Sequence, residues 1–185
     1  MDRGKKAGVE ILISDEIDFQ RRAIKRDPEG HFIILKGRIH QEDINILNIY
    51  APNRGAPKYI GKFLEDCKKD IDGNTIIRGD FNTPFSKMDR SSKHNINKDI
   101  VALNNALDEM DLTDIYRAFH PKEGNYTFFS NAHGTFSKID HIIGHKQAST
   151  NSRKLKSYQA FSLTTRQKGL KGPQNSKTLK LMEIK

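Results

Sequence analysis

The chain has 185 residues, which suits one sizeable domain and is short for two. Hydrophobic residues make up 35% of it and charged residues 30%, so a polar, soluble chain is expected. Its single cysteine, Cys67, excludes an internal disulfide and a cluster of metal-bound thiolates, which predicts a reducing, intracellular compartment, either nucleus or cytoplasm. No apolar run approaches membrane-spanning length and residues 1–6 lack the apolar core of a signal peptide, so neither a membrane location nor secretion is expected.

The net charge of +9 is concentrated at one end of the chain. Residues 1–145 carry as many basic as acidic side chains, whereas residues 146–185 account for the whole excess. We therefore predict a domain over 1–145 and a basic, poorly ordered tail over 146–185, because the tail shows no clear hydrophobic periodicity. The alternative is that this tail binds the phosphate groups of a nucleic acid by releasing counterions.

Strands are predicted throughout the first fifty residues. Apolar and β-branched runs indicate strands at 7–14, 30–36 and 43–50, arranged as an antiparallel meander. The third of them leads into Tyr50 and then Pro52, where the proline stops the ladder of hydrogen bonds.

Two amphipathic helices are predicted in the middle of the chain. Apolar residues at three- to four-residue spacing predict a helix over 57–71, with Pro57 near its start. The same spacing predicts a second helix over 100–110, and Asn97 or Asp99 is a suitable cap for it.

Three more short strands complete the predicted elements. Ile76 and Ile77 indicate a buried strand that Gly79 ends, and further strands are predicted at 126–129 and 138–143. Strands that come in runs, with helices interspersed, favour an α/β (α+β) fold over a doubly wound parallel sheet.

The segment Gly79-Asp80-Phe81-Asn82 carries the clearest chemical signal. In an extended segment, the side chains of Asp80 and Asn82 leave the same face. A carboxylate beside an amide suits a site that activates a water molecule: Asp80 takes the proton, while Asn82 orients the nucleophile or a phosphate oxygen. The alternative is an Asx turn, since Gly-Asp and Asn-Thr-Pro are good turn formers.

Two other polar clusters stand at predicted strand ends, at 48–53 and 137–142. Tyr50 in the first could simply cover the end of the sheet, and Asp140 in the second could cap a turn. His141 follows Asp140 directly and faces the opposite way in a strand, which favours a packed histidine over a catalytic one. The other six histidines show no metal-ligand spacing.

The order of these three clusters along the chain and their amino-acid sequences resemble those of the endonuclease/exonuclease/phosphatase superfamily. More closely, they resemble the endonuclease domain of LINE-type retrotransposon polyproteins, which is related to apurinic/apyrimidinic endonucleases. The resemblance extends from about residue 5 to residue 144 and includes 25–31, 114–121 and 126–130. It implies a deoxyribonuclease I-like fold, which is a sandwich of two β-sheets flanked by helices. It also implies an enzyme that cleaves phosphodiester bonds of DNA with a divalent cation, usually Mg²⁺.

The resemblance assigns roles to individual residues. Asp80 resembles the carboxylate that activates or orients the attacking water and is the candidate metal ligand, and Asn82 resembles its phosphate-contacting partner. Tyr50 resembles the tyrosine whose hydroxyl reaches the scissile phosphate, and Asp140 the aspartate that orients a catalytic histidine. Three further positions are candidates for contact with DNA: Thr127, Ser137 and Arg90.

The sequence departs from the family's pattern at both ends. The first strand, its asparagine and the metal-binding glutamate of the family have no counterpart here, and Leu163 and Thr164 stand where the family has aspartate and histidine. We therefore expect doubtful Mg²⁺ binding and little or no nuclease activity, because a catalytic unit that loses one member slows by on the order of 10³-fold or more. The missing strand also predicts marginal stability, since a sheet without it exposes unpaired edges.

Several functions remain open at this point. The first is an impaired endonuclease that is a fragment or degenerate copy of a longer retrotransposon polyprotein. A non-functional translation product is a further alternative. The second is a non-catalytic nucleic-acid-binding module that uses the basic tail. The third is a phosphoesterase of the same superfamily that acts on inositol phosphates or lipids. The amino-acid sequences at 50–53 and 126–130 favour the members of the superfamily that act on nucleic acids.

Overall fold

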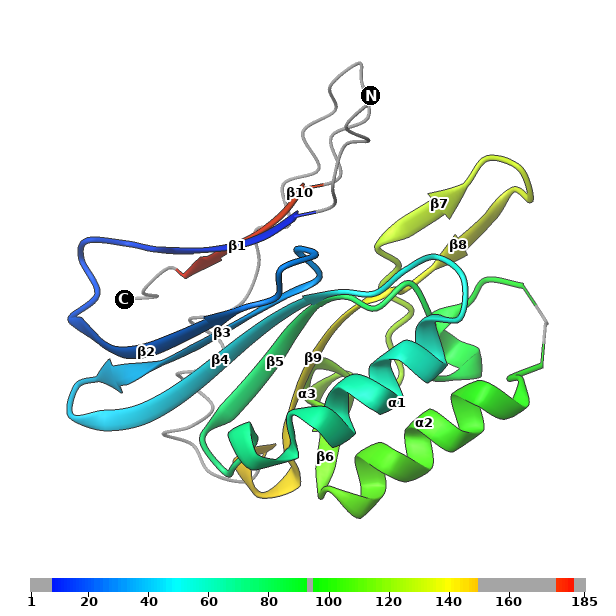
Figure 1. The fold of residues 1–185 in the computed structure, drawn as a ribbon. Helices are drawn as coiled ribbons and strands as arrows, with labels where there is room; N and C mark the ends of the chain where they lie inside the picture. The colour runs from blue at the N-terminus through cyan, green and yellow to red at the C-terminus, as the bar shows by residue number, and fades with distance from the viewer. Residues whose placement is uncertain (1–7, 93–94, 150–175, 182–185) are drawn as a thin grey trace.

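A six-stranded mixed sheet forms the centre of the computed structural model, which describes residues 8–92, 95–149 and 176–181 (Figure 1). In spatial order its strands are β2 (Phe19–Arg26), β3 (Phe32–Ile39), β4 (Glu42–Tyr50), β5 (Thr75–Asp80), β9 (Asp140–His145) and β6 (Leu112–Asp114). Strands β4 and β5 pair in parallel, and the other neighbours are antiparallel. The parallel pair requires a crossover connection, which helix α1 (Ala56–Asp66) and the short 3-10 helix η1 (Lys68–Asp70) supply.

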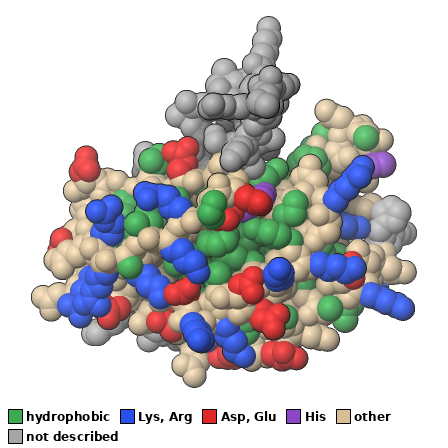
Figure 2. Space-filling model, viewed as in Figure 1, with side chains coloured by type: hydrophobic (Ala, Val, Ile, Leu, Met, Phe, Trp, Pro, Cys, Tyr) green, Lys and Arg blue, Asp and Glu red, His purple; other side chains and the backbone are tan. Residues whose placement is uncertain are grey.

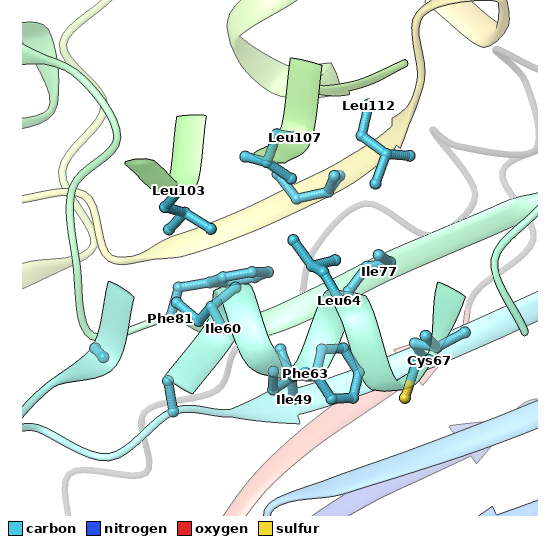
Figure 3. Packing of buried hydrophobic residues seen from close by; sticks show 14 of the residues in the cluster. Ile49, Ile60, Phe63, Leu64, Cys67, Ile77, Phe81, Leu103, Leu107 and Leu112 are labelled. Atoms are coloured by element: carbon cyan, nitrogen blue, oxygen red, sulfur yellow. The ribbon is translucent and has the colours of Figure 1, made fainter. Parts of the chain in front are cut away.

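Two helices cover one face of this sheet. Helix α1 and helix α2 (Lys98–Glu109) turn their apolar stripes toward it, and α2 begins where the Asn97 side chain accepts a hydrogen bond from the Ile100 amide, 2.9 Å away. Figure 3 shows the resulting core, which is formed mainly by aliphatic and aromatic side chains of the two helices and the sheet: Ile49, Ile60, Phe63, Leu64, Ile77, Phe81, Leu103, Leu107 and Leu112.

A second β layer crosses the other face. Strand β1 (Gly8–Ile13) pairs in parallel with β10 (Ser176–Leu181), and the pair forms a separate two-stranded sheet (Figure 1). Ile11 and Ile13 of β1 pack against a smaller core that includes Ile46 and Ile76 of the main sheet. Because side chains alternate along a strand, β4 and β5 send every second residue to the helices and the residues between to the β1–β10 layer.

A hairpin projects from the end of the molecule at which β9 begins (Figure 1). Its strands are β7 (Phe128–Ser130) and β8 (Thr135–Ser137), which pair with each other as a separate two-stranded sheet. Four aromatic side chains on it or beside it are exposed: Tyr126, Phe128, Phe129 and Phe136. The remaining short elements are η2 (Lys87–Asp89), α3 (Ile115–Phe119) and η3 (Lys146–Ser149).

The predicted α/β fold class is confirmed, as are both predicted helices, but two details of the prediction are wrong. The strand at 7–14 does not belong to the meander, where the unpredicted β2 takes its place beside β3. The strands predicted at 126–129 and 138–143 are present as β7 and β9, and the strand that pairs with β7 is β8, which was not predicted. Gly79, finally, does not end its strand, because β5 continues to Asp80.

The basic segment stays largely undescribed. Residues 150–175, with the Leu163-Thr164 departure from the family pattern, lie outside the described residues, while residues 176–181 form β10. The boundary proposed near residue 145 therefore remains a prediction. In the part of the chain that the structure describes, no helix is long and apolar enough to cross a membrane.

Candidate active site at one end of the central sheet

Three of the sequence-predicted site residues form one row across the sheet. Tyr50 on β4 is the register partner of Asp80 on β5, and Asp80 is the register partner of Asp140 on β9. All three share the sheet face of Ile46 and Ile76, which is the face toward the β1–β10 layer. Asp80 is buried and the other two are partly exposed. The row therefore places two carboxylates and a phenol side by side at the end of the strands.

Gly79 makes this row possible. Its φ angle is +149°, and a Cβ atom added there would lie 1.8 Å from the carbonyl oxygen of Ile49 on β4. Only glycine permits so close an approach of the two backbones. One residue further along, the Ala51 amide donates a hydrogen bond to the Asp80 carbonyl at 2.8 Å, which holds the ends of β4 and β5 together.

Asn82 is placed differently from the prediction. Its backbone is left-handed, with φ of 46°, so Asp80 and Asn82 do not lie in one extended segment. The Asn82 amide donates to Oδ1 of Asp80 at 3.0 Å, which is the Asx turn considered as the alternative. The Asn82 side-chain nitrogen donates to the Ala51 carbonyl at 2.6 Å. Asn82 thus secures the two strand ends to each other beside the row.

The opposite face of β9 carries a buried ionic cluster, which we call the Asp114 cluster and which consists of Asp114, Lys138 and His141. Asp114 Oδ2 is 2.6 Å from Lys138 Nζ and 2.8 Å from His141 Nδ1. The other ring nitrogen of His141 is 3.0 Å from the carbonyl oxygen of Thr83, and the ring stacks on Phe85 at 3.9 Å. The expectation that His141 is a packed histidine is confirmed.

The charges of this cluster depend on one another. Burial by itself raises the pKa of the Asp114 carboxyl, but the hydrogen bonds and positive charges of His141 and Lys138 outweigh it and hold that pKa well below its usual range. Lys138 and His141 flank Asp140 in sequence, and Thr83 follows Asp80 by three residues. The cluster therefore connects the two segments that carry the carboxylates of the row.

The three residues predicted to contact DNA meet at the base of the hairpin. The Thr127 amide donates to the Ser137 carbonyl at 3.0 Å, and Arg90 forms an isolated β-bridge with Ser137. The Thr127 hydroxyl accepts hydrogen bonds from the amides of Ile139, at 3.0 Å, and Asp140, at 3.2 Å. Thr127 thus helps to position Asp140, a role that the sequence pattern did not indicate.

Sequence reasoning missed two buried polar residues beneath the row. Asn48 is 2% exposed, and its side-chain nitrogen donates to the Glu10 carbonyl of β1 at 2.9 Å, which attaches the β1–β10 layer to the sheet. Arg78, its register partner on β5, is 6% exposed. The available signal for Arg78 was a charged residue inside the apolar run of a buried strand.

The residues of the row fit a divalent metal ion poorly. Among the described residues, no group of three or more acidic, histidine or cysteine side chains is placed to hold a metal. Asp80 and Asp140 could offer two carboxylates, a number that suffices for Mg²⁺ when water and phosphate complete its shell. However, the buried guanidinium of Arg78 interacts electrostatically with Asp140 and opposes a further positive charge there.

Known proteins resemble this chain in sequence and in fold. No protein-family model matches the chain. The "Transposon TX1 uncharacterized 149 kDa protein" of Xenopus laevis is 26% identical over 156 residues, which cover 77% of this chain and 12% of that protein. The chain thus spans only a small part of that relative.

Two solved structures share the fold. An AP endonuclease from Archaeoglobus fulgidus aligns with a TM-score of 0.55 and 19% identity, over 71% of this chain and 61% of that one. The endonuclease domain of TRAS1, a telomere-specific non-LTR retrotransposon, aligns with a TM-score of 0.54 and 12% identity, over 73% of this chain and 58% of that one. The chain shares the fold of these two endonucleases, and together with its similarity to the transposon protein this confirms its resemblance to the endonuclease domain of LINE-type retrotransposon polyproteins.

Proposed function

We propose that this chain is a DNA-binding domain of the retrotransposon endonuclease type whose phosphodiesterase activity is strongly impaired. The observation that carries the proposal is the row of Tyr50, Asp80 and Asp140, three functional groups that the β-sheet register brings together from distant parts of the sequence. The rest of a longer polyprotein would be its covalent partner, as the share of the transposon relative covered by this chain suggests.

In this proposal the row faces a phosphate group of the DNA backbone. The Tyr50 hydroxyl donates a hydrogen bond to a phosphate oxygen, and the carboxylate of Asp80 orients a water molecule. Asn82 contributes less than its family counterpart, because its side-chain nitrogen is engaged by the Ala51 carbonyl. Impairment follows because the two carboxylates leave most of a metal ion's coordination shell to water and phosphate, and because the row contains no histidine to protonate the leaving oxygen.

The hairpin supplies the second part of the DNA-binding surface. Phe129 and Phe136 are 45% and 47% exposed, and their ring centroids lie 4.6 Å apart. Exposed aromatic rings of this kind stack on nucleic-acid bases, with about 1–3 kcal/mol for each base. By contrast, Figure 2 shows the basic and acidic side chains of the described residues interspersed over the face that carries α1 and α2. We therefore assign DNA contact to the row and the hairpin.

The test separates binding from cleavage. Fluorescence anisotropy in EDTA, with a labelled DNA duplex that carries a single-stranded overhang, measures binding by the wild-type chain and by Phe129→Ala. Nicking of a supercoiled plasmid with Mg²⁺ measures cleavage by the wild-type chain and by Asp80→Asn. We expect binding that Phe129→Ala weakens roughly tenfold, and little or no nicking. Robust nicking that Asp80→Asn abolishes would contradict the impairment, and absence of binding at low salt would contradict the function.

A second candidate function is nucleic-acid binding by the basic tail alone, favoured by the excess of positive charge in residues 146–185. Replacing Arg153, Lys154 and Lys156 with glutamine removes three charges and leaves the sequence of β10 unchanged. If the tail carries the binding, these replacements will reduce the number of counterions released on binding by about three, measured as a shallower slope of log affinity against log salt concentration. Phe129→Ala will then leave the affinity unchanged. The opposite result assigns the binding to the hairpin.

A further inference from the structure

The candidate site contains a positive charge of its own, directly below the row. On β5, Arg78 precedes Asp80 by two residues, so both side chains lie on the same face of the strand. In the ladder between β5 and β9, Arg78 is opposite Ile142 and Asp80 is opposite Asp140. Arg78 and Asp140 are therefore diagonal neighbours on one face, a separation that a long arginine side chain spans.

The surroundings of Arg78 make its charge consequential. It lies between the apolar rung of Ile46 and Ile76 and the polar row, with Asn48 beside it on β4. Burial lowers the pKa of the Arg78 guanidinium below its ordinary value, and the negative charge of Asp140 acts in the opposite direction. An arginine stays protonated at neutral pH even under these conditions. The site thus contains a permanent cation where little water screens it.

We propose that Arg78 supplies the resident positive charge of this site and thereby excludes a divalent cation from the Tyr50–Asp80–Asp140 row. The inference rests on the proposed function only for the location of the site. A guanidinium on the same face as the two carboxylates repels a doubly charged ion and neutralises part of the negative charge that would attract it. The site then interacts with phosphate through side chains of the protein alone.

The experiment measures binding of Mn²⁺ as a probe, by the loss of the electron paramagnetic resonance signal of the free ion. Arg78→Gln removes the charge and keeps a polar side chain of similar shape. We expect wild-type protein to bind Mn²⁺ weakly, Arg78→Gln to bind at least tenfold more tightly, and Arg78→Gln with Asp80→Asn to lose the gain. Arg78→Lys, which keeps the charge, should resemble the wild type.

The matched control is Arg38→Gln. Arg38 lies on β3 and pairs with Asp43 at 2.7 Å, so this variant removes one positive charge far from the row and should not change Mn²⁺ affinity. Circular dichroism verifies that each variant is folded. A folded Arg78→Gln that gains no affinity would overturn the inference.

A second measurement does not depend on that variant. Tight Mn²⁺ binding by the wild-type chain that Asp80→Asn or Asp140→Asn weakens would also overturn the inference, even where Arg78→Gln fails to fold. DNA binding is measured separately in EDTA, so a failure of the proposed function and a failure of this inference give different results.

Discussion

The two faces of the central sheet are built from the same strands and serve different purposes. On the helix-covered face, Leu47, Ile49 and Ile77 pack against α1 and α2 in a continuous apolar core. On the opposite face, alternate positions of the same strands change from isoleucines to Asn48 and Arg78 and then to the row. The comparison shows that one face stabilises the strands, and that the register so established positions polar groups on the other.

The polar face depends on this division because its groups are costly to bury. A buried charge needs a partner in a fixed position, whereas a buried leucine tolerates small shifts. The apolar face therefore has to hold β4, β5 and β9 in register before the row can exist. Variants on each face test this dependence.

The largest effect is expected where the two faces share one backbone constraint. Gly79→Ala would place a Cβ atom 1.8 Å from the Ile49 carbonyl oxygen, so β4 and β5 would have to separate. We expect a loss of more than about 4 kcal/mol in the free energy of unfolding, or no folding at all. Urea denaturation followed by circular dichroism measures it. The control is Gly61→Ala in α1, where nothing lies within 4 Å and helix propensity predicts stabilisation by roughly 0.5–1 kcal/mol.

The next effect concerns the Asp114 cluster, which connects the segments of the row. Asp114→Asn would leave Lys138 and His141 buried without their shared carboxylate, at a cost of roughly 3–5 kcal/mol near neutral pH. Exposed Asp108, paired with Lys146, provides the control variant Asp108→Asn, which should change stability little.

This cluster also predicts a pH dependence. Since folding lowers the pKa of Asp114, its contribution is fully present above its unfolded value near 3.8 and is lost as the pH falls through the still lower folded-state value. Wild-type stability should therefore fall on acidification below about pH 4 more steeply than that of Asp114→Asn. Equal slopes for the two proteins, measured by urea denaturation at several pH values, would contradict the assignment.

The smallest of these effects comes from the apolar face. Leu64→Ala removes a fully buried side chain of α1 and should cost about 2–5 kcal/mol through lost burial and a cavity. The exposed Val101 of α2 provides the control variant Val101→Ala, for which a change within about 0.5 kcal/mol is expected. If Leu64→Ala also weakens DNA binding in the folded protein, the register of the row depends on the apolar core.

Much of the fold was predictable because local patterns dominate it. The spacing of Ile60 and Leu64, like that of Leu103 and Leu107, indicates helices without reference to any other segment. Strand β2 was missed because it is an edge strand: residues 20–26 are exposed, and no alternation marks them.

The candidate site likewise contains residues that the sequence indicates and residues whose role only the structure shows. Tyr50, Asp80 and Asp140 could be found from their motifs. The sequence marked Arg78 only as a charge inside an apolar run, and it indicated no role for Arg78 or Asn48. A buried polar residue acquires its role from the partners that other strands bring to it, and no local pattern records those partners. The same reason applies to Asn82, whose left-handed backbone and bond to Ala51 depend on the neighbouring strand end.

The sequence by itself determined where the two long helices and several of the strands form, which family they resemble and which residues can carry chemistry, because these properties follow from side-chain type and short-range spacing. Only the tertiary structure decided that Tyr50, Asp80 and Asp140 form one row, that the Asp114 cluster lies behind it and that a buried arginine lies beneath it. Those facts depend on strand register and on which face each residue takes, and both are set by contacts between segments far apart in the chain.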